Sequence, residues 1–518
     1  MSQHHSSGAF ISEDTSRLLV YFVCSLPLVL FMHSLFSPAS LRHIPTVGGS
    51  SLPLLSYKGA WDFQTSGRSV LQRGYEKYKG KVFKIPFLDR WVAVITGREL
   101  VDEMQRLSDD TVSFFQGSGE VTGFKYVFQN FAPRRHSHFH VNMIQRQLTK
   151  HMSVAFGEMY EELDVVFKKL LPDNETEWVP VHAIDVARTA VARASNRIFV
   201  GLPLCRDPAF LKFVVNFTLD VARARDVLAF FPPILKSFMA KMVVNLDARI
   251  QEGMEIFRPL IEERMKLVKQ LGKDSPDRPD DMFQWILDAL VERNEPMEQV
   301  VLMAMFVNIA AINTSSNSFT HALYHLAARP DWIAPLRQEA ESAIGEEGWT
   351  KNAMSKLVMT DSFLRESQRY NSIVPLTCVR KALQPFTLSD GTHIPQGTIC
   401  VTPAFATHFD DDNYEDAAAF DPWRYVPKDT TPDAKGAAQK QFVTTSAEYV
   451  PFGHGKHACP GRFFAATELK AMMAYIVLNY DVKFANEGVR PENAASALST
   501  RPHQEARVLF RKRNNPLV

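Results

Sequence analysis

Residues 452–461, FGHGKHACPG, place the strongest constraint on the fold and function of this chain. Three glycines, two histidines, a proline and a cysteine occur there directly before a helical pattern. One interpretation is a zinc site, with His454, His457 and Cys459 as three ligands. A structural zinc site needs four ligands, usually in spaced pairs, and no second pair lies nearby in the sequence. A buried structural turn and a cradle for a prosthetic group are the other two interpretations.

The residues around the cysteine favour the prosthetic group. A buried turn would explain Gly453, Gly455 and Gly461 as residues with positive φ, but it does not explain the helical run that follows. Pro460 suits a first helical turn, which places Cys459 at a helix N-terminus. Free N–H groups and the helix dipole stabilise an anion there, so we expect a lowered thiol pKa. Such a thiolate is a suitable axial ligand for haem iron.

The same stretch resembles the haem-binding loop of cytochromes P450, Phe-x-x-Gly-x-Arg/His-x-Cys-x-Gly. The matching residues are Phe452, Gly455, His457, Cys459 and Gly461. The resemblance implies the cytochrome P450 fold, mainly α with a minor β component, and a haem b whose iron is bound by the Cys459 thiolate. It implies further that Phe452 packs near the sulfur and that His457 donates a hydrogen bond to a haem propionate. The Cys-x-x-Cys-His pattern of covalent attachment is absent, so the haem should be non-covalent.

Two further motifs fit this family. Glu366 and Arg369, in ESQR, are three residues apart and share a helix face. They precede Cys459 by a separation similar to that of the family's K-helix pair, and FDPWRY (420–425) resembles its meander motif. The resemblance implies a structural network of Glu366, Arg369 and Arg424 in which a bidentate clamp fixes the proximal core. The alternative is a solvated ion pair, which contributes little stability.

AAINTS (310–315) matches the family's distal-helix pattern, Ala/Gly-Gly-x-Asp/Glu-Thr-Thr/Ser, only in part. Thr314 is present, and its hydroxyl can bond a carbonyl one turn back and open the helix locally; the alternative is a core threonine. Ala311 stands where glycine is usual, and Asn313 stands where an acid is usual. Because asparagine cannot release and regain a proton at neutral pH, we expect proton delivery through water ordered by Asn313 and Thr314.

Other contacts with the haem and the substrate follow from the resemblance. Arg380 corresponds to the arginine that family members aim at a propionate. The C-helix motif Trp-x-x-x-Arg lacks its tryptophan here, so Arg146 or His140 would take its place. The substrate pocket has apolar candidates, each of which could also be ordinary core: Phe124, Phe128, Met303, Ile309, Ala310, Ile373, Val374 and Leu376.

An electron-donating partner is needed, because no flavin or nicotinamide module is recognisable. GSGEVTG (117–123) mimics a nucleotide-binding loop, but no βαβ unit surrounds it. The family implies NADPH–cytochrome P450 reductase as the partner, with cytochrome b5 as a second candidate. Lys435, Lys440, Lys456 and Arg462 could form a basic face for an acidic reductase. For Lys435 and Lys440, solvated loop lysines are an equally good interpretation.

Residues 18–36, LLVYFVCSLPLVLFMHSLF, carry no formal charge over 19 residues. Their helical length of about 30 Å matches one hydrocarbon core, and the alternative of a signal peptide lacks a clear cleavage site. Charge bias places the following residues in the cytosol. We therefore expect a lumenal tail (1–17), a transmembrane signal anchor (18–36), a Pro/Gly linker (37–56) and a catalytic domain (57–518), in a single pass of the endoplasmic reticulum membrane. Residues 230–238, FFPPILKSF, should dip into the membrane surface.

Composition excludes other classes of protein. With 58 basic and 57 acidic residues, the net charge of +1 argues against nucleic-acid binding. The five cysteines are far apart, so a disulfide framework is not expected and a reducing compartment fits. Long helical patterns, such as 301–327, and β-rich runs at 81–97 and 379–403 predict one large, mainly helical domain.

Together these features predict a haem-thiolate monooxygenase that inserts one oxygen atom from O₂ into a C–H bond of a lipophilic small molecule. The stretches 134–152 and 310–332 resemble fungal cytochromes P450 of the ent-kaurene-oxidase type, which suggests terpenoid oxidation in secondary metabolism. Two alternatives stay open. One is a haem-thiolate isomerase or dehydratase that uses no external O₂, motivated only by Asn313; the other is a non-catalytic haem sensor or carrier.

Overall fold

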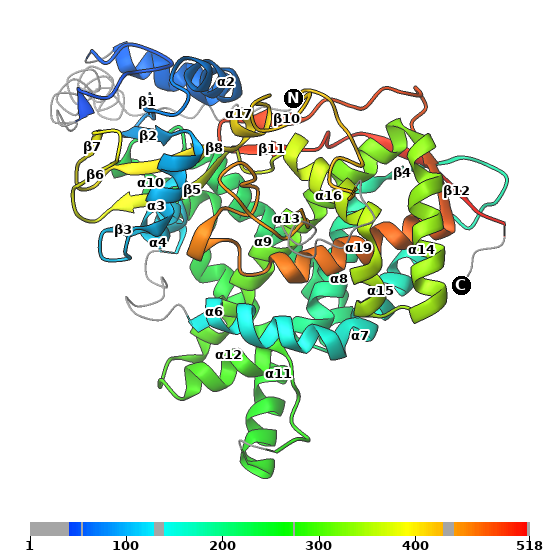
Figure 1. The fold of residues 1–518 in the computed structure, drawn as a ribbon. Coiled ribbons are helices and arrows are strands. Elements are labelled where there is room, and N and C mark those ends of the chain that lie inside the picture. Colours follow the sequence, from blue (N-terminus) through cyan, green and yellow to red (C-terminus); the bar gives the residue numbers. More distant parts are fainter. Residues whose placement is uncertain (1–40, 53–54, 129–138, 273–274, 428–439, 515–518) are drawn as a thin grey trace, which may run out of the picture.

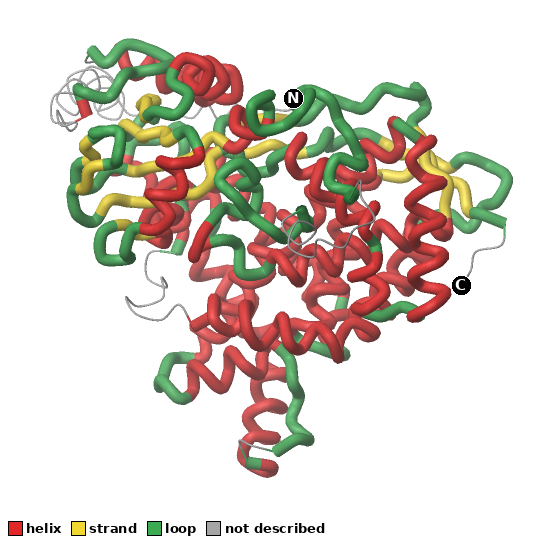
Figure 2. The backbone as a smooth tube through the Cα atoms, viewed as in Figure 1, coloured by secondary structure: helices red, strands yellow, loops and turns green. Residues whose placement is uncertain are grey.

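The computed structural model describes residues 41–52, 55–128, 139–272, 275–427 and 440–514. Helices dominate this part of the chain (Figure 2). The α-helices are α2 (Leu55–Lys77), α3 (Arg98–Arg106), α4 (Phe114–Val121), α5 (Phe124–Val127), α6 (Phe139–Asn142), α7 (Thr149–Leu170), α8 (Ala183–Phe199), α9 (Pro208–Leu228), α10 (Pro233–Val243), α11 (Leu246–Leu271), α12 (Met282–Val291), α13 (Met297–Ala328), α14 (Ile333–Glu347), α15 (Lys351–Lys356), α16 (Val358–Tyr370), α17 (Ala404–His408) and α19 (Arg462–Asn479). Shorter turns are the π-helix η2 (Met143–Leu148) and the 3₁₀ helices η3 (Leu204–Arg206), η4 (Pro330–Trp332) and η5 (Gly455–His457).

The strands form small sheets at the edges of the helical body (Figure 1). They are β1 (Val82–Pro86), β2 (Trp91–Ile95), β3 (Val112–Ser113), β4 (Val179–His182), β5 (Leu376–Ala382), β6 (Phe386–Thr387), β7 (His393–Ile394), β8 (Ile399–Pro403), β9 (Tyr480–Lys483), β10 (Ala494–Ser496), β11 (Ser499–Arg501) and β12 (Arg507–Lys512). The largest sheet has five strands in the order β1-β2-β8-β5-β3. Its β1–β2 hairpin is antiparallel, and β2 pairs in parallel with β8, which joins segments three hundred residues apart.

Strand β5 contains a bulge beside a predicted site residue. Between the pairs Thr377↔Thr402 and Arg380↔Cys400 the register shifts, so β5 has one more residue than β8 across this interval. Within the bulge, Cys378 has a φ of 52°, a left-handed conformation that is uncommon for a residue with a side chain. Because a bulge changes the direction in which the following side chains point, it sets the orientation of Arg380.

Helix α13 is the centre of the main core. It packs against α8, α9, α16 and α19, and most of its 32 residues are buried. Among the described residues it is the one helix whose length and hydropathy would allow it to cross a membrane, and more than half of that apolar window is inside the protein. We therefore interpret α13 as a core helix.

The mainly helical fold with a minor β component was predicted correctly. The β-rich run at 81–97 forms β1 and β2, and the apolar stretch at 301–327 lies within α13. Residues 117–121 are the end of α4, and residues 122–123 connect α4 to α5. Within the described residues no βαβ unit flanks this segment. The predicted anchor at 18–36 lies outside the described residues, as does Lys435, so the anchor and the domain boundaries stay predictions.

Candidate functional site

The loop that carries Cys459 packs tightly between α3 and the start of α19. The Cys459 N–H donates to the Phe452 carbonyl at 2.7 Å, which closes the loop on itself. Gly455 has a φ of 73°, and a Cβ at this position would lie 2.9 Å from the Cβ of Gln105 on α3. Gly453 also has a positive φ, of 69°. The buried-turn interpretation required the same conformation at Gly461, but this residue is the N-cap of α19 and its φ is −86°.

Two opposing effects act on the Cys459 thiol. Burial raises its pKa above the ordinary value, while the backbone N–H groups of Gly461 and Arg462 and the Arg462 charge lower it. The expectation of a net lowered pKa was wrong, because α19 begins three residues after the cysteine and desolvation outweighs the helix terminus. The donors nevertheless point at the sulfur, and binding to a metal cation deprotonates a thiol outright.

His457 lies beside the cysteine loop in an aromatic setting. Its ring stacks on Phe114, with centroids 5.5 Å apart and an interplanar angle of 14°. Its Nε2 lies 2.8 Å from Asp109 Oδ1, and Lys456 Nζ lies 3.0 Å from the same oxygen. Because Nε2 faces the Asp109 carboxylate, a hydrogen bond from Nδ1 to a propionate would require the doubly protonated ring, whereas burial lowers the pKa of His457.

Arg380 is a buried cation with no carboxylate partner among the described residues. Its exposed fraction is 1%, and burial lowers its pKa. Its Nη1 donates to the Val379 carbonyl at 2.8 Å, its Nη2 donates to Gln105 Oε1, and its Nε lacks a partner. A buried, unpaired charge is costly, and a carboxylate of a bound group would relieve that cost. Arg380 therefore fits a haem propionate.

Replacing Arg380 with leucine is expected to weaken haem retention by about tenfold or more, the usual effect of losing an outer partner of a metal site. The haem-free protein should unfold no more easily than the wild type, because the substitution removes a buried charge that has no carboxylate partner. Transfer of haem to an excess of apomyoglobin measures the first quantity, and urea unfolding of the haem-free protein measures the second. Arg146→Leu serves as the comparison, and a larger haem loss in that variant would make Arg146 the main anchor.

One face of α13 is accessible in the middle of this otherwise buried helix. Ala310 and Thr314 are exposed, and Phe306, one turn earlier, is half-buried. The four-residue spacing places these three side chains on the same helix face. Phe306 was missed by the sequence analysis, although its spacing from Thr314 could have identified it. This accessible face leaves space for a bound group beside Thr314.

The polar groups of this face are already oriented. Thr314 Oγ1 donates to the Ala310 carbonyl at 2.7 Å, which is the backbone contact expected from the sequence. Asn313 Oδ1 accepts from Asn317 Nδ2 at 3.1 Å. An Asn317 N–H that donates to Oδ1 leaves the Nδ2 group of Asn313 as the available donor, so position 313 can offer a hydrogen bond but not a proton.

The apolar pocket candidates fall into two groups. Phe124 and Phe128 have ring centroids 5.5 Å apart, and both contact Phe306, at 6.1 and 6.2 Å. Met303 and Ile309 are buried in the same apolar cluster. Leu376 instead packs within a separate cluster on the five-stranded sheet, so the structure does not bring it together with the others.

The residues that follow α16 border the strand β11. Ile373 is half-buried, and its carbonyl accepts from the Thr500 N–H at 3.1 Å. Val374 keeps 37% of its surface exposed. An exposed valine next to a fixed backbone can contact a ligand without further rearrangement.

The two C-helix candidates differ in burial. His140 is buried on α6, with its ring 6.2 Å from Phe115 and 5.8 Å from Phe306. Arg146 is exposed on the π-helix η2. His140 therefore joins the aromatic group beside His457, whereas Arg146 is free to extend its side chain.

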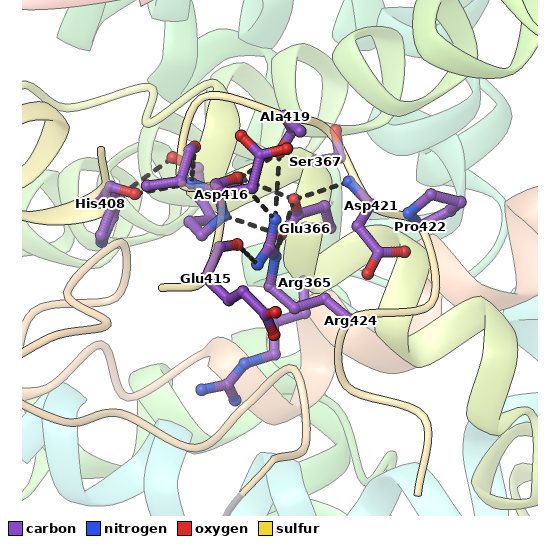
Figure 3. A network of polar contacts seen from close by, with 12 residues as sticks. Arg365, Glu366, Ser367, His408, Glu415, Asp416, Ala419, Asp421, Pro422 and Arg424 are labelled. Atoms are coloured by element: carbon purple, nitrogen blue, oxygen red, sulfur yellow. Dashed lines mark hydrogen bonds and ion pairs between the residues drawn. The ribbon is translucent and has the colours of Figure 1, made fainter. Parts of the chain in front are cut away.

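Glu366, Arg369 and Arg424 form one buried network (Figure 3). Arg369 binds both oxygens of Glu366 at 2.7 Å, and Arg424 Nε lies 3.2 Å from each of them. Glu366 and Arg369 have no exposed surface. Arg369 also donates to the carbonyls of His408 and Ala417, at 2.6 and 2.8 Å. The network joins α16 to the loop after α17, as expected for a structural clamp.

The basic residues near Cys459 have mixed environments. Arg462 donates from Nη1 to the Cys459 carbonyl at 2.9 Å and from Nε to the Val443 carbonyl at 3.0 Å. Lys456 donates to the Leu107 carbonyl at 2.9 Å. Lys440 is exposed. Arg462 is thus tied to the loop itself, which leaves Lys440 and Lys456 as the more accessible charges.

The residues present fit a cysteine-bound haem. Cys459 would bind the iron, Arg380 would face a propionate, and His457 lies beside the cysteine loop. A zinc site receives no support, because no cluster of three or more His, Cys, Asp or Glu residues suited to a metal occurs within the described ranges.

Comparison with known proteins agrees with this chemistry. A family model described as Cytochrome P450 matches residues 49–510. Cytochrome P450 monooxygenase 71 of Postia placenta is 40% identical over 506 residues, which cover 97% of this chain and 99% of the relative. Cytochrome P450 monooxygenase CYP512U6 of Ganoderma lucidum is 35% identical over 453 residues, covering 87% and 88%. Ent-kaurene oxidase P450-4 of Gibberella fujikuroi is 30% identical over 512 residues, covering 96% and 98%. The chain therefore belongs to the cytochrome P450 family of haem-thiolate monooxygenases.

Proposed function

We propose that this protein hydroxylates a lipophilic terpenoid in secondary metabolism, with electrons from NADPH–cytochrome P450 reductase. The 30% identity to an ent-kaurene oxidase, which extends over 96% of this chain, supports the substrate class. The aromatic and apolar surface made by Phe124, Phe128 and Phe306 beside the accessible face of α13 supports a lipophilic substrate. This surface is the observation on which the proposal chiefly rests.

Each residue of the site would have a separate role. When bound, haem supplies dioxygen activation and oxygen transfer to a C–H bond. Cys459 binds the iron, and N–H groups directed at its sulfur stabilise the thiolate. Arg380 would fix the haem through a propionate, and His457 would add a second such contact as the doubly protonated ring. Thr314 and Asn313 order water for proton delivery on the substrate side, and the aromatic side chains exclude bulk water.

Thr314→Ala is expected to uncouple NADPH use from product formation by about tenfold or more, because positioned proton transfer contributes on the order of 10²–10⁴-fold to enzymatic rates. NADPH consumption, product and hydrogen peroxide are measured in the same reaction. Thr320→Ala is the matched control, because Thr320 makes the same bond to a carbonyl one turn back, at 2.7 Å, in a fully buried part of α13. Full coupling in Thr314→Ala would contradict the proposed role.

We further propose that the protein lies on the endoplasmic reticulum membrane with its catalytic domain in the cytosol. Apolar side chains from the start of α2 and from α10 with its preceding loop are exposed, and Trp61 contacts Phe230 at 5.5 Å. The exposed set is Leu52, Leu55, Trp61, Phe230, Ile234, Phe238 and Met242. Such a surface favours contact with lipid. The accessible lysines near the cysteine loop would meet the acidic reductase, and cytochrome b5 is a second candidate for the same face.

The substrate proposal is tested in membranes that contain the chain and a reductase. The membranes are supplied with NADPH, isotopically labelled dioxygen and a panel of terpenoid hydrocarbons that includes ent-kaurene. A product that carries one labelled oxygen atom is expected, and mass spectrometry detects it. Products without label and without NADPH would indicate the isomerase or dehydratase alternative. No product, together with no ligand-induced change in the haem spin state, would indicate a sensor.

A further inference from the structure

Helix α19 carries a buried carboxyl group that has no part in the roles assigned above. Glu468 has no exposed surface. Ser195 Oγ on α8 donates to its Oε1 at 2.7 Å, and its Oε2 has no hydrogen-bond partner among the described residues. The Ser315 hydroxyl on α13 acts on the same carboxyl. Glu468 therefore lies where three helices meet, with hydroxyl groups as its polar neighbours.

The surroundings of Glu468 disfavour its negative charge. Burial raises the pKa of Glu468 to about 7, and the hydrogen bonds from Ser195 and Ser315, which favour the ionised form, offset this only in part. No charged side chain of the described residues contributes to this pKa. A carboxyl group in such surroundings keeps its proton up to neutral pH. A modest change in the local electrostatic potential is then sufficient to change how much of it is protonated.

The charged groups on the elements around Glu468 have partners of their own. Lys470, two residues further along α19, lies 2.6 Å from Asp361 of α16. Tyr475 Oη lies 3.2 Å from Asp164 of α7. The pairs on the remaining neighbours are Arg193–Glu162 (α8 and α7), Arg337–Asp481 (α14 and β9), Lys356–Glu347 (α15 and α14), Arg369–Glu366 (α16) and His321–Arg490 (α13 and the loop before β10). Within the described part of the chain, the Glu468 carboxyl has no ionic partner.

Glu468 connects the helix that follows Cys459 with the helix that carries Thr314. Helix α19 begins at Arg462, and Glu468 follows six residues later, about 9 Å along the helix axis. Ser315 directly follows Thr314, and α13 packs against both α8 and α19 (Figure 1). Reduction of a haem held by Cys459 adds one negative charge to this part of the interior. Two like charges in a protein interior repel each other over such a range.

We propose that the Glu468 carboxyl takes up a proton when the haem iron is reduced, so that an electron and a proton enter the protein interior together. The electron passes to the iron from the reductant that the monooxygenase reaction uses, and the proton passes from solvent to a carboxylate oxygen of Glu468. One O–H bond forms, no covalent bond of the protein breaks, and each electron is accompanied by at most one proton. The inference is independent of the substrate.

The test measures the reduction potential of the haem in the substrate-free holoenzyme by equilibrium titration with redox mediators. At a fixed applied potential, the ratio of reduced to oxidised haem should fall about tenfold as the pH rises from about 6 to about 9, a shift of about 59 mV. This is the scale of the interaction between two unit charges roughly 12 Å apart in a protein interior. An equilibrium potential does not depend on how fast the proton arrives.

Glu468→Gln keeps the shape of the side chain and fixes its charge at zero. Its potential should stay at the value of the wild type near pH 6 and should lose the pH dependence assigned to Glu468. His457 and the haem propionates can add a pH dependence of their own, which is common to both proteins and cancels in their difference. Glu298→Gln makes the same substitution at an exposed position in the first turn of α13, and this matched control should titrate like the wild type.

Infrared difference spectra identify the proton acceptor directly. Reduction of the wild type at about pH 8 should produce the C=O stretch of a protonated carboxyl, and this signal should be absent in Glu468→Gln. Ser195→Ala is the second variant if Glu468→Gln does not bind haem. Since the Ser195 hydroxyl lowers the pKa of Glu468, its removal should move the pH-dependent interval upward by about one pH unit, the effect of one hydrogen bond to a charged group.

Three results would overturn the inference. A difference in potential between the wild type and Glu468→Gln that does not change with pH would show that Glu468 does not titrate with the iron. An unshifted interval in Ser195→Ala would show the same. A carboxyl signal of equal size in Glu468→Gln would show that another acid takes the proton. These measurements need no substrate, so a failure of the terpenoid proposal remains distinguishable from a failure of this one.

Discussion

Cys459→Ser is expected to abolish the Soret band that marks thiolate coordination in the reduced, carbon monoxide-bound protein. Product formation should fall on the order of a thousandfold or more, the scale of loss when an indispensable catalytic group is removed. A serine hydroxyl is a far weaker acid than a thiol, so it stays protonated and gives the N–H groups of Gly461 and Arg462 no anion to stabilise as an iron ligand. A difference spectrum of dithionite-reduced membranes measures the band, and pyridine haemochrome measures the haem content.

The control is Cys205→Ser, which makes the same substitution at a fully buried cysteine beside α8 and α9. It should keep the band and lose only part of its stability, because it introduces a buried hydroxyl. A variant with serine at position 459 that retains the thiolate band at full haem occupancy would contradict the assignment of the iron ligand.

Glu366→Gln is expected to destabilise the protein by about 3–5 kcal/mol, because it leaves the buried Arg369 and the partly buried Arg424 without their shared carboxylate. A loss of this size is a large fraction of the roughly 5–15 kcal/mol that stabilises a typical domain. Most of the expressed chain should therefore fail to reach the haem-bound state. The measurements are the ratio of carbon monoxide-binding protein to total polypeptide and the urea midpoint of the surviving fraction.

The comparison is Asp331→Asn in the Arg329–Asp331 pair, whose side chains are 54% and 57% exposed. An exposed pair contributes about 1 kcal/mol or less, so this variant should behave like the wild type. Equal stability of Glu366→Gln and Asp331→Asn would show that the network around Glu366 is not the clamp we infer.

Local sequence patterns predicted much of the fold and several residues of the candidate haem site. The hairpin β1–β2, the buried helix α13, the cysteine loop and the Glu366 pair each depend on residues close in sequence, so spacing and turn chemistry were sufficient. The contact of Thr314 with Ala310 was also foreseeable, because it lies within one helical turn.

Features that depend on distant residues were not predictable in this way. The parallel pairing of β2 with β8 aligns Val92 with Ile399. The bulge at Cys378 follows from strand register rather than from local composition. The lowered thiol pKa expected for Cys459 was wrong, because a sequence reveals a helix terminus but does not reveal how far the thiol is desolvated. Lys236 shows the same limit: its Nζ is buried 2.6 Å from Asp89 Oδ2 in the turn between β1 and β2, although a lysine among apolar residues gives no sign that it will be the buried one.

The outward apolar side of α10 has a practical consequence for handling the enzyme. Trimming the chain before residue 41 would remove the segment that we expect to span the bilayer, yet Ile234, Phe238 and Met242 would stay on the surface. A shortened form would still need detergent, or polar replacements at these three positions, to remain monodisperse. Polar replacements on this side leave Lys236 and its ion pair untouched, so solubility can be engineered apart from the haem pocket.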